Sequence, residues 1–165
     1  MQYVKERTQV DISTSWHKSG SYSQYDFSNG KSSIEIKTTM SDNSEVTIKH
    51  QQIFGGHPCT LAVINCEQYE NGETIEDVIA AMYADPAAFK GMNFSINLAK
   101  ELKRVSIADV KEIRFCVRQI QLFAAKDINP FPIIPDAVDK LSYKLDISEL
   151  NPLSETDSDF ILKTY

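Results

Sequence analysis

Two carboxylates and a lysine lie close together in the first third of the sequence. Asp26 precedes Glu35 and Lys37, and a single residue separates the last two. Carboxylate oxygens are hard ligands that suit Mg²⁺ or Mn²⁺, and a water bound to such a cation becomes a nucleophile once its pKa falls. A lysine beside the cation can orient that water and stabilise charge on a phosphate. These three residues therefore form a minimal set for phosphodiester hydrolysis.

The elements that must position this set are two strands joined by a tight turn. Residues 22–27 and 32–38 alternate between polar and apolar side chains, which predicts two strands. Asn29 and Gly30 between them are a strong signal for a two-residue hairpin turn, because both residue types accept a positive φ. We therefore expect a β-hairpin here.

A two-residue turn also predicts the register of the hairpin. Ser28 then pairs with Lys31, and Asp26 lies opposite Ser33. Residues that pair directly share a face, as do residues two apart in one strand. Glu35 becomes the diagonal neighbour of Asp26, with the backbones about 7–8 Å apart, so both carboxylates can reach one cation. The predicted polar face carries Asp26, Ser33, Glu35 and Lys37, and the predicted apolar face carries Tyr25, Phe27, Ile34 and Ile36.

The same spacing also has a purely structural interpretation. Glu-x-Lys is common in strands, and a solvated strand face with a cross-strand ion pair would carry the same residues. Spacing alone favours this interpretation over a metal site.

The whole chain predicts one α/β domain over residues 1–165, with a mixed sheet led by the hairpin and flanked by helices. The apolar run 60–66 is the predicted central strand, since a strand buried on both faces is apolar throughout. Residues 1–21 show no strong helix pattern, and the acidic tail from Asn151 is predicted to be loosely ordered.

Helical spacing begins at Thr74, a predicted N-cap that forms a variant capping box with Asp77. A short second helix is predicted to open at Asp85-Pro86, and a third amphipathic helix carries Phe94, Leu98 and Leu102. The remaining predicted elements are strands at 45–50, 113–124 and 141–147, and a rigid extended loop at the proline-rich segment 129–135.

Composition limits the class of protein. The chain has 165 residues and is 42% hydrophobic, which suits a soluble globular domain, and no stretch approaches the length of a membrane span. The N-terminus lacks the apolar region of a secretory signal. Three cysteines without a CxxC pair indicate reduced thiols, and hence a cytoplasmic protein. The net charge of −6 weighs against binding of nucleic acid but leaves room for a local patch.

Several of these segments together resemble a known family. Asp26 followed by Ile34-Glu35-Ile36-Lys37 is similar to the PD-(D/E)xK nuclease signature, and the wider match resembles a PD-(D/E)xK family of unassigned function found among restriction-modification genes. The resemblance covers roughly residues 15–150. The matching runs are Trp16-His17, Tyr25-Asp26-Phe27, IEIKTT, VTIKHQQI, TLAVINC, RFCVRQIQLF and LSYKLDIS.

The resemblance implies a restriction-endonuclease-like fold and a role for each site residue. Asp26 and Glu35 would bind Mg²⁺ (or Mn²⁺) together with the backbone carbonyl of Ile36, and Lys37 would be the catalytic lysine. Gln52, or its neighbour Gln51, would support the site from the start of the following helix.

The implied function is a Mg²⁺-dependent DNA endonuclease of restriction-modification or phage defence. The implied partners are DNA and either a second copy of the chain or other proteins of a defence complex. The family's N-terminal helix is expected to be missing, since only fifteen residues precede Trp16, and Tyr25 stands where the family motif has Pro. The missing helix and the acidic charge favour an alternative, a catalytically inactive nuclease-fold subunit that binds DNA or assembles a complex.

Two basic groups outside the hairpin have two interpretations each. Lys100, Lys103 and Arg104 end a predicted helix, and Arg114 and Arg118 alternate with apolar residues on a predicted strand. Both groups could contact DNA phosphates, but an ordinary solvated surface is the favoured interpretation of each.

Overall fold

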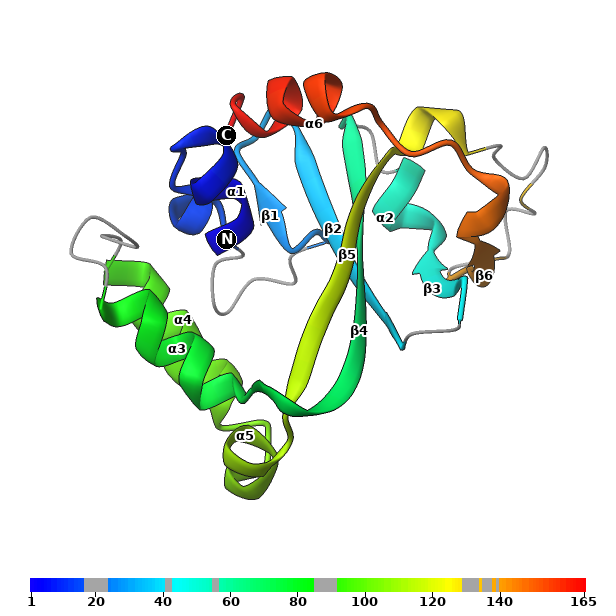
Figure 1. Cartoon of the computed structure of the whole chain (residues 1–165). Helices are drawn as coiled ribbons and strands as arrows, with labels where there is room; N and C mark the ends of the chain where they lie inside the picture. Colours follow the sequence, from blue (N-terminus) through cyan, green and yellow to red (C-terminus); the bar gives the residue numbers. More distant parts are fainter. Residues whose placement is uncertain are drawn as a thin grey trace.

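The computed structural model describes residues 1–16, 24–40, 43–54, 57–84, 92–128, 134, 138 and 140–165. It shows a mixed α/β protein with a four-stranded sheet in the order β1-β2-β4-β5 and a two-stranded sheet of β3 and β6 (Figure 1). The strands are β1 (Phe27–Ser28), β2 (Ser33–Met40), β3 (Glu45–Lys49), β4 (Cys59–Glu73), β5 (Phe115–Ala124) and β6 (Ser142–Asp146). The helices are α1 (Gln2–Thr8), α2 (His50–Phe54), α3 (Ile75–Ala84), α4 (Met92–Leu102), α5 (Ile107–Glu112) and α6 (Glu155–Leu162), with short 3-10 turns η1 (Ile12–Ser15), η2 (Ala125–Asp127) and η3 (Ile147–Glu149).

Strand β4 is the centre of the larger sheet, as its apolar sequence predicts. It pairs with β2 in parallel and with β5 in antiparallel orientation, so the sheet is mixed. Cys59 to Val63 are all buried because helices or strands cover both faces of β4 at this end. None of the helices in the described part of the chain is long and apolar enough to cross a bilayer.

Each face of the sheet has its own core. Helix α2 and the β3–β6 pair cover one face, and helices α1 and α6 lie over the other (Figure 1). The first core, which we call the α2 core, contains Tyr25, Val46, Ile48, Ile53, Cys59, Leu61, Val63, Phe123, Ala125 and Ile128. The second, the α1–α6 core, contains Val4, Ile12, Phe27, Ile34, Ala62, Leu122 and Leu162.

The hairpin forms, but its predicted register is wrong by two residues. Ser28 pairs with Ser33 rather than with Lys31, so residues 29–32 form the loop. The side chain of Asn29 causes this, because its Oδ1 accepts hydrogen bonds from the backbone N–H groups of Lys31 and Ser32, each at 2.9 Å. A shift of two residues leaves every side chain of β2 on its predicted face.

Strand β1 is shorter than predicted, and this changes the position of one residue. The chain bends over residues 24–26 and becomes a strand only at Phe27, while residues 22–23 lie outside the described part. As a result Tyr25 belongs to the α2 core and Phe27 to the α1–α6 core. The prediction that Tyr25 and Phe27 share a face is therefore wrong.

Two helices form where the sequence indicated none. Residues 2–8 are helical although no helix was predicted before Trp16, and the tail predicted to be loosely ordered contains α6. Each helix is short and anchored by few apolar side chains, Val4 in α1 and Leu162 in α6, so neither shows a clear helical stripe. Packing on the sheet, rather than propensity, stabilises helices of this length.

The other predicted helices divide into three cases. The capping box of α3 is confirmed: Asp77 N–H donates to Thr74 Oγ1 and Thr74 N–H donates to the Asp77 carboxylate, both at 3.0 Å. The helix around Phe94 is confirmed as α4, and α5, capped by Ser106, was not predicted. The helix predicted at Asp85-Pro86, most of the proline-rich segment 129–135, and His17 of the family match lie outside the described residues.

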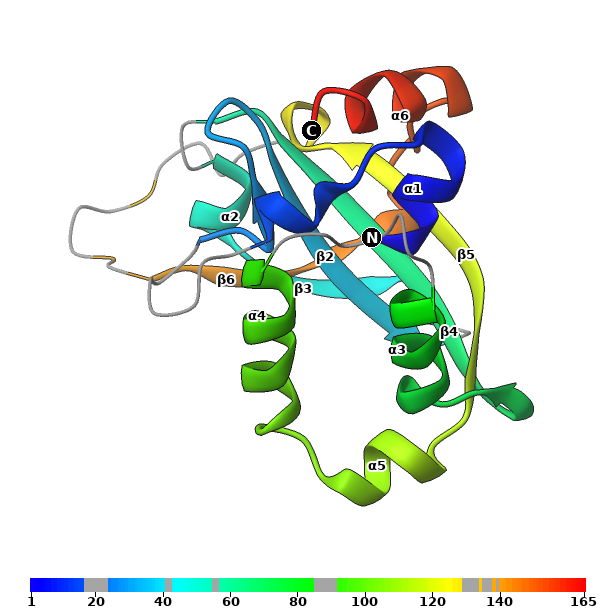
Figure 2. The ribbon, with the colours of Figure 1, turned by 90° about the vertical axis from the view of Figure 1, so that its left-hand side faces the viewer.

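Strands β4 and β5 continue beyond the end of β2 and carry a projecting unit. The pairing of β2 with β4 ends at Met40 and Cys66, after which β4 pairs only with β5. The resulting ribbon leads to α3, α4 and α5, which stand at one end of the molecule (Figures 1 and 2). We call residues 66–117 the arm; the structure describes 66–84 and 92–117 of it.

Candidate functional site

The sequence-predicted site residues lie at the edge of the larger sheet, beneath α2. Glu35 and Lys37 project from β2 on the side of the α2 core, because their partners in β4 are Leu61 and Val63 of that core. Asp26 comes from the bend that precedes β1 and Gln52 from α2. Three separate elements therefore converge on one place.

Asp26 is held by the backbone of β2. Its Oδ2 accepts a hydrogen bond of 2.7 Å from the N–H of Ile36. Because β1 begins only at Phe27, this carboxylate takes the place of a main-chain partner at the edge of β2. The bond directs the Asp26 carboxylate toward the strand that carries Glu35.

The carbonyl of Ile36 lies on the same edge as Asp26. In a strand, the N–H and C=O of one residue point to the same side, and alternate residues point to opposite sides. The N–H of Ser33 donates to the Pro58 carbonyl, which fixes the backbone groups of Ser33 and Glu35 toward β4. The backbone groups of Ile36 therefore face away from β4, consistent with the bond from its N–H to Asp26.

Glu35 is almost completely buried, with 3% of its surface exposed. Its Oε1 accepts a hydrogen bond from Lys37 Nζ at 2.6 Å and another from Gln52 Nε2. Its Oε2 is also buried and makes no hydrogen bond with the described residues, although the backbone N–H of Asp26 lies near enough to this carboxylate to lower its pKa. One oxygen of this carboxylate is thus fully bonded, and the other makes no hydrogen bond with the described residues.

The environment of Glu35 raises the pKa of its carboxyl above the ordinary value. Burial is the main cause, because it disfavours the charged form. The hydrogen bond from Lys37 opposes the shift, and the nearby negative charge of Asp26 adds to it. Perturbed carboxyl groups of this kind are common at functional sites, although structural ion pairs also produce them.

Gln52 links the lysine and the glutamate. Its Nε2 donates to Glu35, while its Oε1 accepts from the backbone N–H of Lys49 at 3.0 Å and lies 3.4 Å from Lys37 Nζ. Of the two glutamines considered in the sequence, Gln51 instead offers its carbonyl to the Gln24 side chain and has an exposed side chain. Gln52 is therefore the residue that contacts the site.

Cys59 is a neighbour of the site that sequence reasoning missed. It aligns with Ser33 in the parallel pairing of β2 and β4, and burial together with the negative charge of Glu35 raises its pKa to about 12. The thiol therefore stays protonated at neutral pH and is a core residue rather than a nucleophile. Only the parallel register, which the sequence did not indicate, could have revealed its position.

The two basic groups predicted outside the hairpin are not at the site: Lys100, Lys103, Arg104 and Arg114 belong to the arm, and Arg118 follows it directly in β5. Arg118 forms an ion pair with Glu67, and Arg114 donates to the Gly72 carbonyl at 2.8 Å and lies 3.7 Å from Asp77. These contacts favour the structural interpretation of both arginines.

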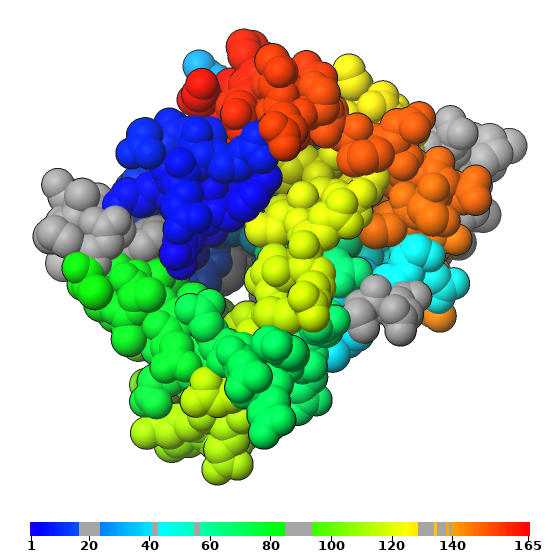
Figure 3. All heavy atoms as spheres, in the orientation of Figure 1, coloured from blue at the N-terminus to red at the C-terminus, as the bar shows by residue number. Residues whose placement is uncertain are grey.

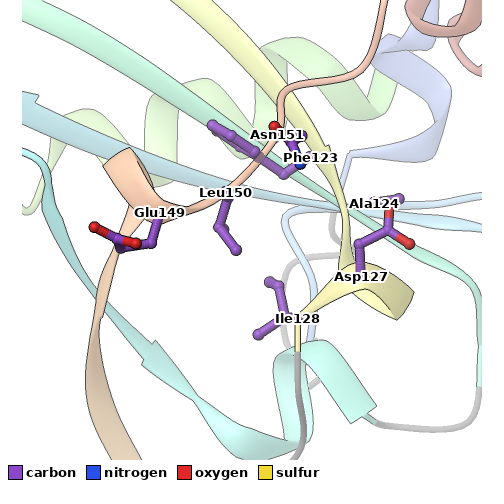
Figure 4. Close-up of a pocket in the computed structure, with 7 residues that line it drawn as sticks. All are labelled: Phe123, Ala124, Asp127, Ile128, Glu149, Leu150 and Asn151. Carbon is purple, nitrogen blue, oxygen red and sulfur yellow. The ribbon is translucent and has the colours of Figure 1, made fainter.

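A separate hollow lies where η2 meets η3 (Figure 4). Figure 4 shows that its two carboxylates, from Asp127 and Glu149, point away from each other. They do not converge on a shared position, so the hollow has no cation-binding geometry. The lining residues are Phe123, Ala124, Asp127, Ile128, Glu149, Leu150 and Asn151.

Within the described residues, no group of three or more His, Cys, Asp and Glu side chains is arranged to hold a metal ion. The set at the sheet edge has two carboxylates, those of Asp26 and Glu35. Comparisons with family models, with curated proteins and with solved structures found no match for this chain. Fold and site thus define a mixed α/β protein with an acidic pair, a lysine and a glutamine at one sheet edge.

Proposed function

We propose that this chain is a metal-dependent endonuclease that hydrolyses phosphodiester bonds of DNA in restriction-modification or phage defence. The observation that carries the proposal is the convergence of Asp26, Glu35, Lys37 and Gln52 from three elements on one sheet edge. The resemblance to PD-(D/E)xK nucleases supplies the DNA substrate and the defence setting. The chemistry of the four residues supplies the reaction type.

The residues present fit a divalent cation. Asp26, Glu35 and the carbonyl of Ile36 would hold it, and all three offer the hard oxygen atoms that Mg²⁺ and Mn²⁺ prefer. The buried Oε2 of Glu35, which makes no hydrogen bond with the described residues, is the clearest sign, since a buried carboxylate oxygen without a partner is costly. When bound, the cation supplies positive charge that lowers the pKa of a water and neutralises a phosphate oxygen.

Lys37 is placed to act on the attacking water and on the phosphate. Its side chain is 22% exposed, whereas the side chain of Glu35 that anchors it is 3% exposed. The bonds to Glu35 and Gln52 hold the ammonium at the site before substrate arrives. In this position Lys37 would orient the water for in-line attack and stabilise the charge that develops on the phosphate.

The decisive experiment is cleavage of plasmid DNA by the purified chain in Mg²⁺ or Mn²⁺. Lys37→Ala and Asp26→Asn should each lower the cleavage rate by about a hundredfold or more, because each removes a charge that acts on the reacting phosphate or on the cation.

Lys163→Ala is the matched control, since Lys163 is an exposed lysine that follows α6 on the other side of the sheet. This control should cleave like the wild type. Cleavage that survives both site substitutions would contradict the assignment of the site.

A further inference from the structure

We infer that Gln24 is a positioning residue of the candidate site, where it holds the bend before β1 against α2. This inference rests on the proposed function, because it concerns how the chain fixes the groups that would hold the cation. Gln24 opens the bend over residues 24–26 and is exposed. Neither its residue type nor its spacing from Glu35 marks it as a site residue in the sequence, so only its contacts reveal the role.

Hydrogen bonds join each pair of the three elements that carry the site. Asp26 joins the bend to β2 through its bond to the β2 main chain, and Gln52 joins α2 to β2 through its bond to Glu35. Gln24 makes the third link, since its Nε2 donates to the main-chain carbonyl of Gln51 in α2. The three links form a closed set that fixes each element against the other two.

The amide of Gln24 is itself held in place by a buried residue. Its Nε2 also donates to the hydroxyl of Tyr25 at 3.0 Å. An amide nitrogen carries two N–H groups, so Gln24 can bond both acceptors at once. Tyr25 is 6% exposed and lies in the α2 core together with Ile53 of α2. A buried ring therefore directs an exposed side chain toward α2.

The bend needs such a link because the sheet holds it through a very short strand. In the described part of the chain, β1 pairs with β2 only over its two residues, both of which follow Asp26. The opposite edge of the sheet is held differently. Figure 3 shows α1 and the residues that lead into α6 lying against β5, and the N–H of Leu153 donates to the carbonyl of Leu122 at 2.7 Å. At the edge that carries the site, the amide of Gln24 makes the corresponding link to the neighbouring element.

The ligands of a cation tolerate little movement. Their atoms must be held within about 0.5 Å of the binding geometry, and residues that orient such ligands commonly contribute about ten- to a hundredfold to metal affinity. Asp26 lies two residues after Gln24 in the same bend, so a bend released from α2 would let its carboxylate move relative to Glu35. Gln24 thus acts on the cation through Asp26 and touches neither the cation nor the phosphate.

The first test is calorimetric titration of the purified chain with Mn²⁺. Gln24→Ala and Gln24→Met both remove the N–H donors, and methionine keeps the length of the side chain. Each should raise the Kd for Mn²⁺ by about tenfold. Because Gln24 is exposed, urea unfolding in EDTA should give the wild-type midpoint for both variants, whereas a merely structural role would lower it.

Gln51→Ala is the matched control, because it removes an exposed glutamine side chain and keeps the main-chain carbonyl that accepts from Gln24. This control should bind Mn²⁺ like the wild type. Plasmid cleavage gives a second measurement. In the Gln24 variants the Mg²⁺ concentration for half-maximal cleavage should rise about tenfold. Their rate at saturating Mg²⁺ should stay within about threefold of the wild type, since Gln24 does not act on the phosphate.

The outcomes separate this inference from the proposed function. Gln24 variants that bind Mn²⁺ as tightly as the wild type, or no more weakly than Gln51→Ala, would overturn the inference alone. A wild type that neither binds Mn²⁺ nor cleaves DNA would remove the proposed function and the inference with it. Mn²⁺ binding that depends on Gln24 in a wild type that does not cleave would support the inference and contradict only the nuclease activity.

Discussion

Glu35 is deeply buried, and among the described residues only one of its two carboxylate oxygens has hydrogen-bond partners. Oε1 holds Lys37 and Gln52, and under the proposed function Oε2, which has no partner among the described residues, would bind the cation. Much of this arrangement could be predicted from the sequence, because strand alternation places Glu35 and Lys37 on one face and a two-residue error in register leaves that face unchanged. The contacts of Cys59 could not be predicted, because they depend on the parallel pairing of β2 and β4. Those of Tyr25 could not be predicted either, because they depend on the bend before β1.

The raised pKa of Glu35 predicts a pH-dependent effect on stability. The unfolded chain releases this proton near the ordinary pKa of 4.5, whereas the folded chain keeps it to higher pH. Rising pH therefore destabilises the folded protein through Glu35 between those two pKa values, and below the lower value the effect is absent. Glu35→Gln cannot ionise, so its free energy of unfolding relative to the wild type should rise as the pH increases above the ordinary carboxyl pKa.

Urea unfolding in the presence of a chelator at a series of pH values measures this difference. Glu73→Gln, at an exposed position on the arm, should show no comparable change with pH. The free energy of unfolding of Glu35→Gln minus that of the wild type should increase with pH. If this difference stays constant or falls as the pH rises, the folded protein does not raise the pKa of Glu35.

At the scale of elements, the sheet was easier to predict than the helices that cover it. The apolar run of β4 and the alternation of β2 are strong local signals. Helices α1 and α6 give weak signals because each is short and mostly polar, and they are joined to each other by contacts distant in sequence. Arg7 Nε, for example, donates to Asp159 at 2.8 Å.

Leu162 is the residue that most directly tests the packing of α6. It is 1% exposed in the α1–α6 core, so Leu162→Ala should lower the free energy of unfolding by about 2–5 kcal/mol. Phe160→Ala on the same helix removes an exposed ring and should change it by less than about 0.5 kcal/mol. Thermal or urea unfolding of both variants measures the difference, and similar values for the two would mean that α6 does not dock on the sheet.

At the scale of the whole molecule, charge limits how the chain could meet DNA. The net charge is −6, and the basic residues Arg104, Arg114 and Arg118 pair with carboxylates on the arm. Under the proposed function, a divalent cation at the site would offset Asp26 and Glu35, which otherwise repel phosphate. The balance of charge over the chain thus predicts that DNA binding depends on the cation.

Fluorescence anisotropy with a labelled DNA duplex measures this dependence. The Lys37→Ala variant, which should not cleave, is expected to bind at least about tenfold more tightly in Mg²⁺ than in EDTA, because the cation offsets both site carboxylates. Adding Glu35→Gln to the Lys37→Ala variant should reduce the ratio of its DNA affinity in Mg²⁺ to that in EDTA, since one of the two carboxylates is removed. Equal binding in both buffers would contradict a cation site, and cation-dependent binding by a wild type that does not cleave would favour the inactive, DNA-binding alternative.

The four side chains of the candidate site all come from residues 26–52, one uninterrupted stretch of chain. Strand β4 and the residues after it bury Glu35 but contribute none of these four groups. An exchange of gene segments that kept this stretch intact would transfer the whole constellation at once. Related proteins could therefore diverge freely in the arm and in the C-terminal helix while inheriting the same chemistry.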